Sequence, residues 1–215
     1  MKIALVGATG RVGSALLKEA TARGHVVTAI ARSADRLAAV PAVTPAPVDV
    51  LADPAGLAAA FRGQAAIVHA FRMARDGSIQ ERIDGQRAGT AAILAASRAA
   101  SVRRILAVGG AGTLEVNGVR NMDRPEFPAA WQGGAQSTAL IKDMLKAEPG
   151  LEWTYLSPSH NLVDGERTGR FRLGLDEMLT GPDGESRITV ADYAVAMIDE
   201  LERPAHTGRR FTVGY

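Results

Sequence analysis

The sequence predicts an α/β fold in which a doubly wound parallel sheet is covered by helices on both faces. Apolar runs of strand length alternate with helical stretches along most of the chain, a pattern typical of parallel sheets with right-handed crossovers. The first run, Lys2–Val6, leads directly into glycines spaced G-x-x-G-x-x-G at Gly7, Gly10 and Gly13. With 215 residues the chain is long enough to bury a large core, and we expect residues 1–215 to form a single domain.

Strands are predicted where apolar residues run almost without interruption, because a strand buried on both faces needs no polar alternation. Such runs recur along the whole chain, separated by stretches with helical patterning. The predicted strands, in chain order, are Lys2–Val6, His25–Ala31, Ala42–Val48, Ala65–Phe71, Val102–Val108, Glu152–Leu156 and Phe211–Tyr215.

Helices are predicted between these strands, and two of them carry clear start signals. Asp53 followed by Pro54 is an N-cap residue with proline in the first turn. Thr189 with Asp192 three residues later is a partial capping box. A Gly-Gly pair at 133–134 is expected to break the fourth helix. The predicted helices are Arg11–Thr21, Pro54–Phe61, Ile79–Ala100, Pro128–Ala147 and Thr189–Glu202.

Residues 159–188 interrupt the alternation. The stretch Asn161–Arg187 is rich in glycine and charge and shows no regular pattern. In open α/β sheets, ligands bind beyond the carboxyl ends of the strands, which is where this segment emerges. We therefore expect a small irregular segment that covers the substrate; the alternative is a plain surface excursion.

The composition excludes several classes of function. The net charge is only +2 despite a pI near 9.2, and the arginines are scattered, which argues against a nucleic-acid partner. The chain has no cysteine, so disulfides, thiolate catalysis and cysteine-bound metals are excluded. Histidines are isolated, so no metal site is expected. No apolar run is long enough to cross a membrane, and the first strand begins at Lys2; a cytoplasmic protein without a signal peptide or membrane partner is the expectation.

The glycine motif indicates a dinucleotide site. One glycine allows the tight turn, one lets a pyrophosphate approach the backbone, and one lets the helix pack against the strand. The amides at the helix start then face the phosphates, and the helix dipole favours their charge. A glycine-rich turn that binds nothing is the alternative. The expected contacts in this loop are Gly7, Thr9, Gly10, Arg11, Val12 and Gly13.

The residues after the second predicted strand indicate which dinucleotide is bound. Proteins that prefer NAD place a carboxylate there to hold the ribose hydroxyls. Here the positions hold Arg32 and Ser33, with Arg36 one turn later. Arginine can bind a 2′-phosphate and serine can donate to it. The sequence therefore predicts NADP, with NAD as a second choice; a solvated Arg32 without this role is the alternative.

Further cofactor contacts are expected at the ends of the third and fourth predicted strands. Asp49, followed by Val50, could accept a hydrogen bond from the adenine amino group; alternatively it caps its own turn. Ala70, Phe71 and Arg72 should pass along the ribose and pyrophosphate, where Arg72 could add a phosphate contact.

The sequence lacks the usual acid of carbonyl-reducing enzymes with this arrangement. They carry Tyr-x-x-x-Lys, in which the lysine lowers the tyrosine pKa. Here Ser159 and Met197 stand four residues after Tyr155 and Tyr193, and Tyr215 is the last residue. This absence counts against carbonyl reduction by that route and against epimerisation. A flavin acceptor fits better, because the two cofactors carry the reactivity and the protein need only align them.

The acceptor site is expected at the ends of the fifth and sixth strands. Gly109 and Gly110 would form one wall, and Pro158, Ser159 and His160 the other. His160 could stack on the acceptor or hydrogen-bond to it; the alternative is a loop histidine satisfied by backbone. A second histidine, inside the fourth predicted strand, is interpreted as a core residue.

The chain resembles the atypical short-chain dehydrogenases, in particular the bacterial group of candidate NADH-flavin reductases, which are relatives of biliverdin reductase B and of NmrA-like proteins. This resemblance spans essentially the whole chain. It implies a Rossmann fold, a nicotinamide dinucleotide, and a flavin-like or quinone-like acceptor. Besides the glycine motif and Arg32, the matching stretches are Val108–Val116, Trp153–Ser159, Gly165–Gly169, Arg187–Ala194 and Arg210–Tyr215.

The resemblance also bears on the candidate catalytic residues, Ser159 and His160. In the biliverdin reductase B relatives a Pro-x-His segment lines the substrate site, and Pro158–His160 matches it. Those relatives place a serine after the fifth strand, where this chain has glycine or alanine and Thr113 is the nearest hydroxyl, which puts serine-assisted proton delivery in doubt.

Two arginines of the covering segment, Arg167 and Arg170, could contact a flavin phosphate. The alternative is an ion pair with Asp164, Glu166 or Asp176.

Three functions remain open from the sequence. The first is NADPH-dependent reduction of a free flavin, such as FMN or FAD, or of a quinone, with the flavin as a substrate. The second is an NmrA-like NADP(H) sensor without catalysis, which an exposed apolar patch around Phe127–Trp131 would favour. The third is reduction of a small carbonyl compound, with Lys142 or His160 as the acid. The expected partner is a small-molecule substrate, and the oligomeric state, a homodimer included, stays open.

Overall fold

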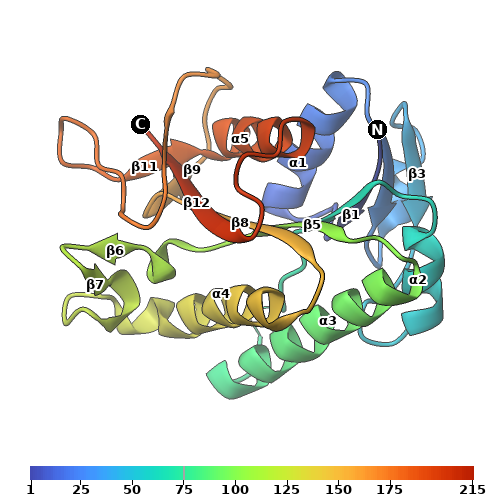
Figure 1. The fold of residues 1–215 in the computed structure, drawn as a ribbon, viewed down its shortest axis with the longest axis horizontal. Coiled ribbons are helices and arrows are strands. Elements are labelled where there is room, and N and C mark those ends of the chain that lie inside the picture. The colour runs from blue at the N-terminus through green and yellow to red at the C-terminus, as the bar shows by residue number, and fades with distance from the viewer. Residues whose placement is uncertain (75) are drawn as a thin grey trace.

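The computed structural model describes residues 1–74 and 76–215, and within them it shows a sheet of eight strands between two layers of helices. Helices α1 and α5 cover one face, while α2, α3 and α4 cover the other (Figure 1). The strand order is β10-β12-β8-β5-β4-β1-β2-β3, and all neighbours are parallel except β10 with β12. The expected doubly wound Rossmann fold is confirmed.

Most strands lie where the apolar runs predict them. The sheet reverses its winding between β1 and β4, which are adjacent and lead to helices on opposite faces. The strands are β1 Lys2–Val6, β2 Val26–Ile30, β3 Val43–Ala46, β4 Ala66–His69, β5 Arg104–Val108, β6 Glu115–Val116, β7 Val119–Arg120, β8 Glu152–Pro158, β9 Asn161–Val163, β10 Arg172–Gly174, β11 Arg187–Thr189 and β12 Arg209–Gly214.

The helices begin at the predicted start signals. The Asp53 side chain accepts a hydrogen bond from the Gly56 N–H at the start of α2, and Thr189 accepts from the Asp192 N–H at the start of α5. Within the described residues, none of the helices combines the length and apolar character that a membrane span needs. The α-helices are α1 Arg11–Ala22, α2 Pro54–Phe61, α3 Ile79–Ala99, α4 Ala129–Ala147 and α5 Val190–Glu202.

The expected break in α4 is wrong, because the helix runs through residues 133–134. Glycine in a helix costs about 1 kcal/mol relative to alanine, but here it permits close packing of α3. A Cβ on Gly133 would lie 2.9 Å from the Ile79 side chain. The space that a side chain at position 133 would occupy is filled by Ile79 of α3, and α4 continues through this position.

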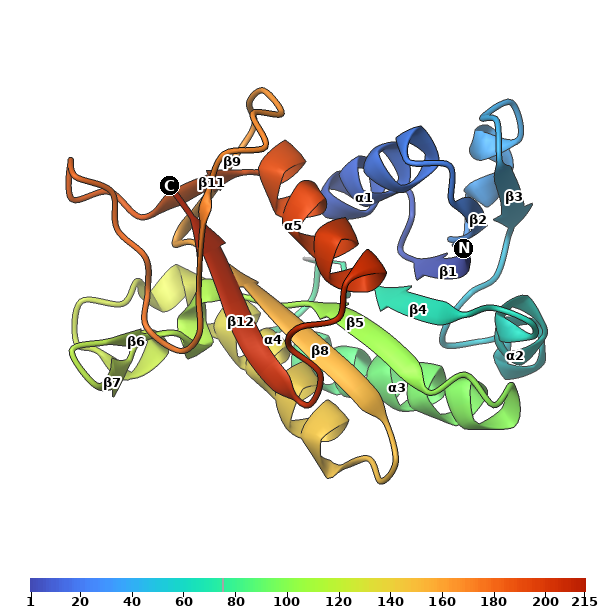
Figure 2. The ribbon, with the colours of Figure 1, turned by 45° about the horizontal axis from the view of Figure 1, so that its top comes forward.

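The segment 159–188 is more regular than expected. It contributes β10, which adds to the edge of the main sheet, and β9 and β11, which form a separate two-stranded sheet. Figures 1 and 2 show β9 and β11 near the C-terminus, on the side of the sheet opposite the β6–β7 hairpin, while residues 176–178, after β10, hydrogen-bond to Glu115 of β6. The segment thus borders the carboxyl ends of β8 and β12, although its strands are made by pairing with distant residues.

A buried carboxylate anchors this segment to α5. The Asp192 carboxylate is fully buried and accepts from the backbone N–H groups of Thr168 and Gly169 at 2.8 Å each. It also accepts from the hydroxyls of Thr168 and Tyr215 at 2.5 and 2.7 Å. Burial alone would raise the pKa of Asp192, but these hydrogen bonds outweigh it and hold the pKa below its usual value. The ionised carboxylate is therefore part of the folded structure.

A second anchor joins the segment to α1. Arg167 contacts the buried carboxylate of Glu19 through two hydrogen bonds of 2.7 and 2.8 Å. Glu19 also pairs with Arg23, which bridges α1 to Asp199 on α5. Arg167 is therefore engaged in an ion pair, as the alternative interpretation has it, but its partner is on α1 rather than in the segment itself.

The first testable prediction concerns the packing of α1 on β1. A Cβ on Gly13 would lie 2.0 Å from the Gly7 carbonyl oxygen, whereas one on Gly134 in α4 would meet nothing closer than 3.9 Å. We expect Gly13→Ala to lower the free energy of unfolding by about 1–3 kcal/mol through overpacking. Gly134→Ala, also in a helix, should raise it by about 0.5–1 kcal/mol. Denaturant unfolding measures both, and equal changes in the two variants would contradict this account.

The second prediction uses the lowered pKa of Asp192. A carboxyl with a depressed folded-state pKa contributes stability above its unfolded pKa of about 4, and loses it as the pH falls through the folded value. Asp192→Asn should therefore reduce the free energy of unfolding by about 1.5–3 kcal/mol near neutral pH, and this deficit should shrink in acid. Denaturant melts of both proteins across that range measure it; a deficit that does not change with pH would exclude the charged anchor.

Candidate functional site

The glycine turn after β1 lies between the ends of its two neighbouring strands. Gly7 has φ +83°, a conformation that favours glycine, and its N–H donates to the Ile30 carbonyl of β2 at 2.8 Å. On the other side, a Cβ on Gly7 would lie 2.6 Å from the Ala70 carbonyl oxygen after β4. The turn is therefore fixed at the point where the sheet reverses its winding, the place where open α/β sheets bind ligands.

The start of α1 offers free backbone donors to this edge. Gly10 is the N-cap residue, and among the described residues no side chain caps the helix and no acidic residue occupies its first turn. Gly10 is exposed, and a Cβ there would meet only the Gly7 carbonyl oxygen, at 3.3 Å. The first-turn N–H groups have no helical partner by geometry, so the backbone at Arg11 and Val12 can receive an anion such as a phosphate. Thr9 is exposed in the same turn.

Arg11 connects this helix start to the covering segment. Its guanidinium donates to the Asp164 carboxylate and to the Leu162 carbonyl oxygen, both at 3.0 Å. The ion pair is exposed, so its contribution to stability is small, about 0–1 kcal/mol. The contact matters for position rather than stability, because it holds β9 beside the start of α1.

The residues predicted to select NADP lie next to the glycine turn. Arg32 and Arg36 are exposed and Ser33 is half-buried, at the carboxyl end of β2 and in the short helical turn Ala34–Leu37 that follows. β2 pairs with β1 along its whole length. The structure thus brings Arg32 and Arg36 to the same edge of the sheet as the first turn of α1.

The Asp49 carboxylate accepts hydrogen bonds from its own turn. Its Oδ1 accepts hydrogen bonds from the N–H groups of Leu51 and Ala52 at 2.9 and 3.3 Å. Val50 is buried in the core. Asp49 therefore caps its own turn through Oδ1, as the alternative has it, and the side chain of Val50 packs inward, while the adenine contact stays a prediction.

The segment after β4 is held by side chains that sequence reasoning missed. Gln86 on α3 is fully buried; its amide N–H donates to the Phe71 carbonyl and its oxygen accepts from the Met73 N–H, both at 3.2 Å. His69 is buried too, and burial lowers its pKa to about 3. It is thus a neutral core residue, as expected. Phe71 packs toward α3, where a Cβ on Gly89 would lie 2.2 Å from its ring.

Gly109 and Gly110, after β5, pack against side chains rather than opening a cavity by themselves. A Cβ on Gly109 would lie 2.5 Å from the Tyr155 ring, and one on Gly110 would lie 2.5 Å from the Thr138 hydroxyl. The Tyr155 hydroxyl accepts from the Gly110 N–H at 3.2 Å and donates to the Thr138 carbonyl at 2.9 Å. The glycines therefore let β8 and α4 approach the end of β5 closely.

None of the three tyrosines is available as an acid. Burial raises the pKa of Tyr155, and it raises that of Tyr193, whose hydroxyl donates to the Leu156 carbonyl, well above the usual value. Tyr215 donates to Asp192 and Thr189, and burial raises its pKa as well. A raised pKa disfavours the phenolate that proton exchange with a substrate requires.

The two candidate catalytic residues after β8 differ sharply. Ser159 is fully buried, and its hydroxyl donates to the Val213 carbonyl at 2.9 Å. This corrects its assignment: Ser159 fastens β12 to the end of β8 and does not reach a substrate. His160 is half-buried; its N–H donates to the Ser186 hydroxyl at 3.1 Å, and its Nδ1 lies 3.4 Å from the Asn121 amide. Pro158, the last residue of β8, is buried beneath them.

Two further residues join this end of the site, although the sequence predicted Arg72 only as a phosphate contact and Trp131 only as part of an apolar patch. Trp131, at the start of α4, places its ring 5.1 Å from that of His160. Arg72, after β4, donates to the Gly134 carbonyl of α4 at 3.5 Å. The site thus draws on the ends of β4, β5 and β8 and on the first turns of α4.

The carbonyl-reduction alternative named Lys142 or His160 as the acid. Burial lowers the pKa of Lys142, and the charge of Arg210 lowers it further. Arg210 pairs with Asp176 and holds the covering segment. Lys142 therefore lies close enough to the Arg210–Asp176 ion pair for both charges to affect its pKa.

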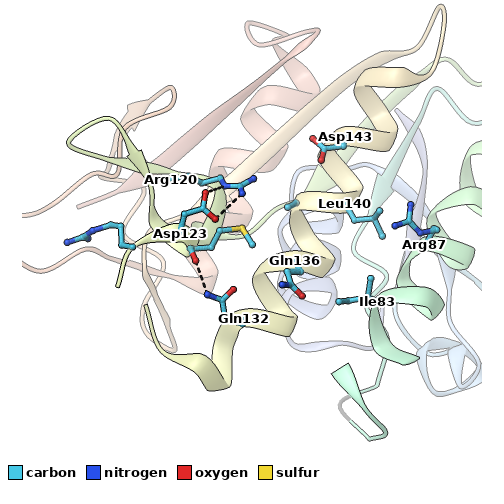
Figure 3. Close-up of a pocket in the computed structure, with 11 residues that line it drawn as sticks. Ile83, Arg87, Arg120, Asp123, Gln132, Gln136, Leu140 and Asp143 are labelled. Atoms are coloured by element: carbon cyan, nitrogen blue, oxygen red, sulfur yellow. Dashed lines mark hydrogen bonds and ion pairs between the residues drawn. The ribbon is translucent and has the colours of Figure 1, made fainter. Parts of the chain in front are cut away.

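A groove of about 750 Å³ lies elsewhere, between α3, α4 and the segment 120–124 (Figure 3). Its walls carry both polar and apolar side chains: Figure 3 shows the Arg120–Asp123 ion pair, with Asp143 and Leu140 on α4 and Arg87 and Ile83 on α3. None of the residues that line it is on the glycine turn or at the strand ends described above. The groove is therefore separate from the candidate cofactor site.

Comparison with known proteins identifies the family of the chain. The sequence pattern of a family described as NAD(P)H-binding matches residues 7–201, from the glycine turn through most of α5. The chain is 37% identical over 219 aligned residues to the uncharacterized protein YwnB of Bacillus subtilis, covering 99% of this chain and 98% of that one.

Solved structures with the same fold carry differing descriptions. A candidate epimerase from Bacteroides thetaiotaomicron is 38% identical, with a TM-score of 0.88 over 100% of this chain and 96% of that one. A candidate NADH-flavin reductase from Streptococcus pneumoniae is 30% identical, with a TM-score of 0.85 over 100% and 99%. With the glycine turn, the uncapped start of α1 and this coverage together, the chain belongs to the NAD(P)H-binding family.

Proposed function

We propose that the protein is an NADPH-dependent oxidoreductase that reduces a free flavin or a quinone-like acceptor. The observation that carries this proposal is the glycine turn with its free backbone donors, set between exposed arginines at one side and His160 at the other. The description of the Streptococcus pneumoniae relative as a candidate NADH-flavin reductase supports the same chemistry.

The spacing of the strands fits an extended dinucleotide. β1 and β8 are separated by β4 and β5, and neighbouring strands lie about 4.8 Å apart, so the glycine turn and His160 are separated by about 14 Å across the sheet. The phosphates would bind at Gly10 and Val12. The nicotinamide end would then lie along Gly109, and an acceptor beside His160.

The end of β2 supports a preference for the phosphorylated dinucleotide. A 2′-phosphate would lie near Arg32, Ser33 and Arg36, which offer two guanidinium groups and a hydroxyl. A hydrogen bond between charged groups contributes about 1.5–3 kcal/mol. NADH would lack the phosphate that these residues bind.

When bound, the dinucleotide supplies a hydride, which together with one proton from solvent reduces a flavin or quinone by two electrons. The chain's own part is to bind, align and exclude water. The buried tyrosines do not supply the proton. His160 would orient the acceptor through stacking or a hydrogen bond, held in place by Asn121 and Ser186.

The alternatives receive less support from the geometry. Epimerisation or carbonyl reduction through a tyrosine would need a phenol that can exchange a proton with the substrate, and all three phenols donate hydrogen bonds within the protein. An exposed apolar patch at Phe127–Trp131 would favour the sensor hypothesis. Phe127 is half-buried against Met122, Ala135 and Ala139, whereas residues 128–131 are exposed, so the exposed apolar surface of this region is confined to one short stretch.

The proposed function is tested by anaerobic oxidation of NADPH with a panel of FMN, riboflavin and menadione as acceptors. Saturable turnover with a flavin or with menadione is the expected result and would identify the acceptor class. Tight NADPH binding without turnover of any acceptor would favour the sensor.

The third prediction concerns cofactor choice. Arg32→Glu should weaken NADPH binding about 10–100-fold, because it replaces a phosphate-binding guanidinium with a carboxylate, and should leave NADH binding almost unchanged. Arg62→Glu is the matched control: Arg62 is exposed after α2, near the amino end of β4, so it carries the same charge change away from the site. Calorimetric titration with both dinucleotides measures the effect; an equal loss for NADPH and NADH would remove the phosphate role.

The fourth prediction concerns His160. His160→Ala should lower kcat/KM for riboflavin about tenfold, the loss that corresponds to 1.4 kcal/mol of acceptor contact, while the dissociation constant for NADPH stays the same. His160→Phe, which keeps a ring but no nitrogen, distinguishes stacking from hydrogen bonding. Steady-state kinetics with riboflavin measure all three proteins, and unaltered rates in both variants would show that His160 does not contact the acceptor.

A further inference from the structure

Trp131 is a large aromatic side chain that folding leaves exposed. Its exposed fraction is 48%, and it is the one strongly exposed aromatic residue in the part of the chain that the structure describes. Tryptophan is usually well buried on average, and an exposed one at the edge of a site commonly contacts a ligand or partner. Packing in the core therefore does not explain why a tryptophan stands at position 131, and two other aromatic rings lie beside it.

The helix α4 places Trp131 at the carboxyl edge of the sheet. Trp131, Gly134 and Thr138 follow the three- and four-residue spacing of one helix face. Thr138 lies against Gly110 at the end of β5, so this face is directed at the site. Trp131, one turn before Gly134, occupies its outer rim.

Neighbouring aromatic rings fix the orientation of the indole. The His160 ring lies 5.1 Å from it at an angle of 50°, and the Phe127 ring approaches edge-on at 6.3 Å and 78°. His160 is in turn held at Nδ1 by Asn121, which is buried. A half-exposed ring that is oriented in advance loses little conformational entropy when a ligand stacks on it.

Open space lies beside the indole on the same helix face. A Cβ on Gly134 would meet only the Arg72 guanidinium, at 3.9 Å, so the space directly beside Gly134 on this helix face is open, and Arg72 borders it through its hydrogen bond to the Gly134 carbonyl. A planar ring placed there would have the indole at one side and a positive charge at the other. Reduced flavins and quinones carry negative charge on their oxygens or ring nitrogens, which a guanidinium favours.

We propose that Trp131 is the stacking surface for the acceptor and selects fused, multi-ring acceptors such as the isoalloxazine of a flavin over single-ring quinones. This inference rests on the proposed function and specifies its substrate class. Stacking between aromatic rings adds to simple area burial, and it grows with the overlap between the rings. A three-ring flavin can cover the indole and reach Arg72 together, whereas a single ring covers only one of them.

The fifth prediction compares acceptor binding in Trp131→Ala and Trp131→Phe. Calorimetry with riboflavin added to the NADP⁺-loaded protein, which cannot transfer a hydride, measures binding without turnover. Trp131→Ala should weaken riboflavin binding about tenfold, the factor that corresponds to 1.4 kcal/mol, and Trp131→Phe should restore part of it. Binding of NADPH should not change. Trp153→Phe, which removes the other tryptophan from β8 where it packs on the core, is the matched control and should bind riboflavin normally.

The kinetic arm separates this inference from the proposed function. If the wild-type protein reduces riboflavin, Trp131→Ala should raise the KM for riboflavin about tenfold and alter that for 1,4-benzoquinone little; an equal change in both, or none, would overturn the selection by Trp131. If the wild-type protein reduces no acceptor but riboflavin binding still depends on Trp131, the proposed function fails and the stacking surface stands. Riboflavin binding that is absent, or that is unaffected in Trp131→Ala, would overturn the inference.

Discussion

The close packing of the α1 backbone on the turn after β1 is the constraint on which the site depends. Only a hydrogen at Gly13 leaves room for the Gly7 carbonyl, because a Cβ would lie 2.0 Å from it. The helix therefore begins directly over the end of β1, and its first N–H groups face the edge where β2 and β4 also end. The same edge extends through β5 to β8, so one packing contact sets the reference point for the proposed binding of phosphates, nicotinamide and acceptor.

At the β8 end of this edge, hydrogen bonds and ion pairs fix the walls of the site. The Tyr155 hydroxyl is shared between Gly110 and α4, which brings the helix that carries Trp131 to the site. The covering segment is held by two carboxylates, Asp192 of α5 and Glu19 of α1. Because charged groups buried with several hydrogen-bond partners define one geometry, these contacts position the walls of the site, while the proposed chemistry comes from the cofactor and its acceptor.

Local patterns predicted the fold, and they brought the predicted cofactor residues of the glycine turn and of the end of β2 to one edge of the sheet. Apolar runs, caps and the glycine spacing are properties of neighbouring residues, and the structure places Arg32 beside the turn as expected. The acceptor half depends on contacts between distant residues. Trp131 reaches His160 across 29 positions, β10 pairs with β12 through Gly174 and Thr212, and the burial of Ser159 follows from β12. No short-range pattern encodes these contacts. The sequence therefore did not predict the short strands of the covering segment, the burial of Ser159 or the continuity of α4 through residues 133–134.

The most direct test of the central claim is a single turnover without oxygen. The protein loaded with NADPH is mixed with riboflavin, and the absorbance of NADPH and of oxidised flavin is followed together. The account predicts that both decay at the same rate, mole for mole, and that this rate saturates as riboflavin increases. NADPH that remains bound and unoxidised at every riboflavin concentration would contradict the claim that this edge of the sheet brings a hydride donor and a flavin together.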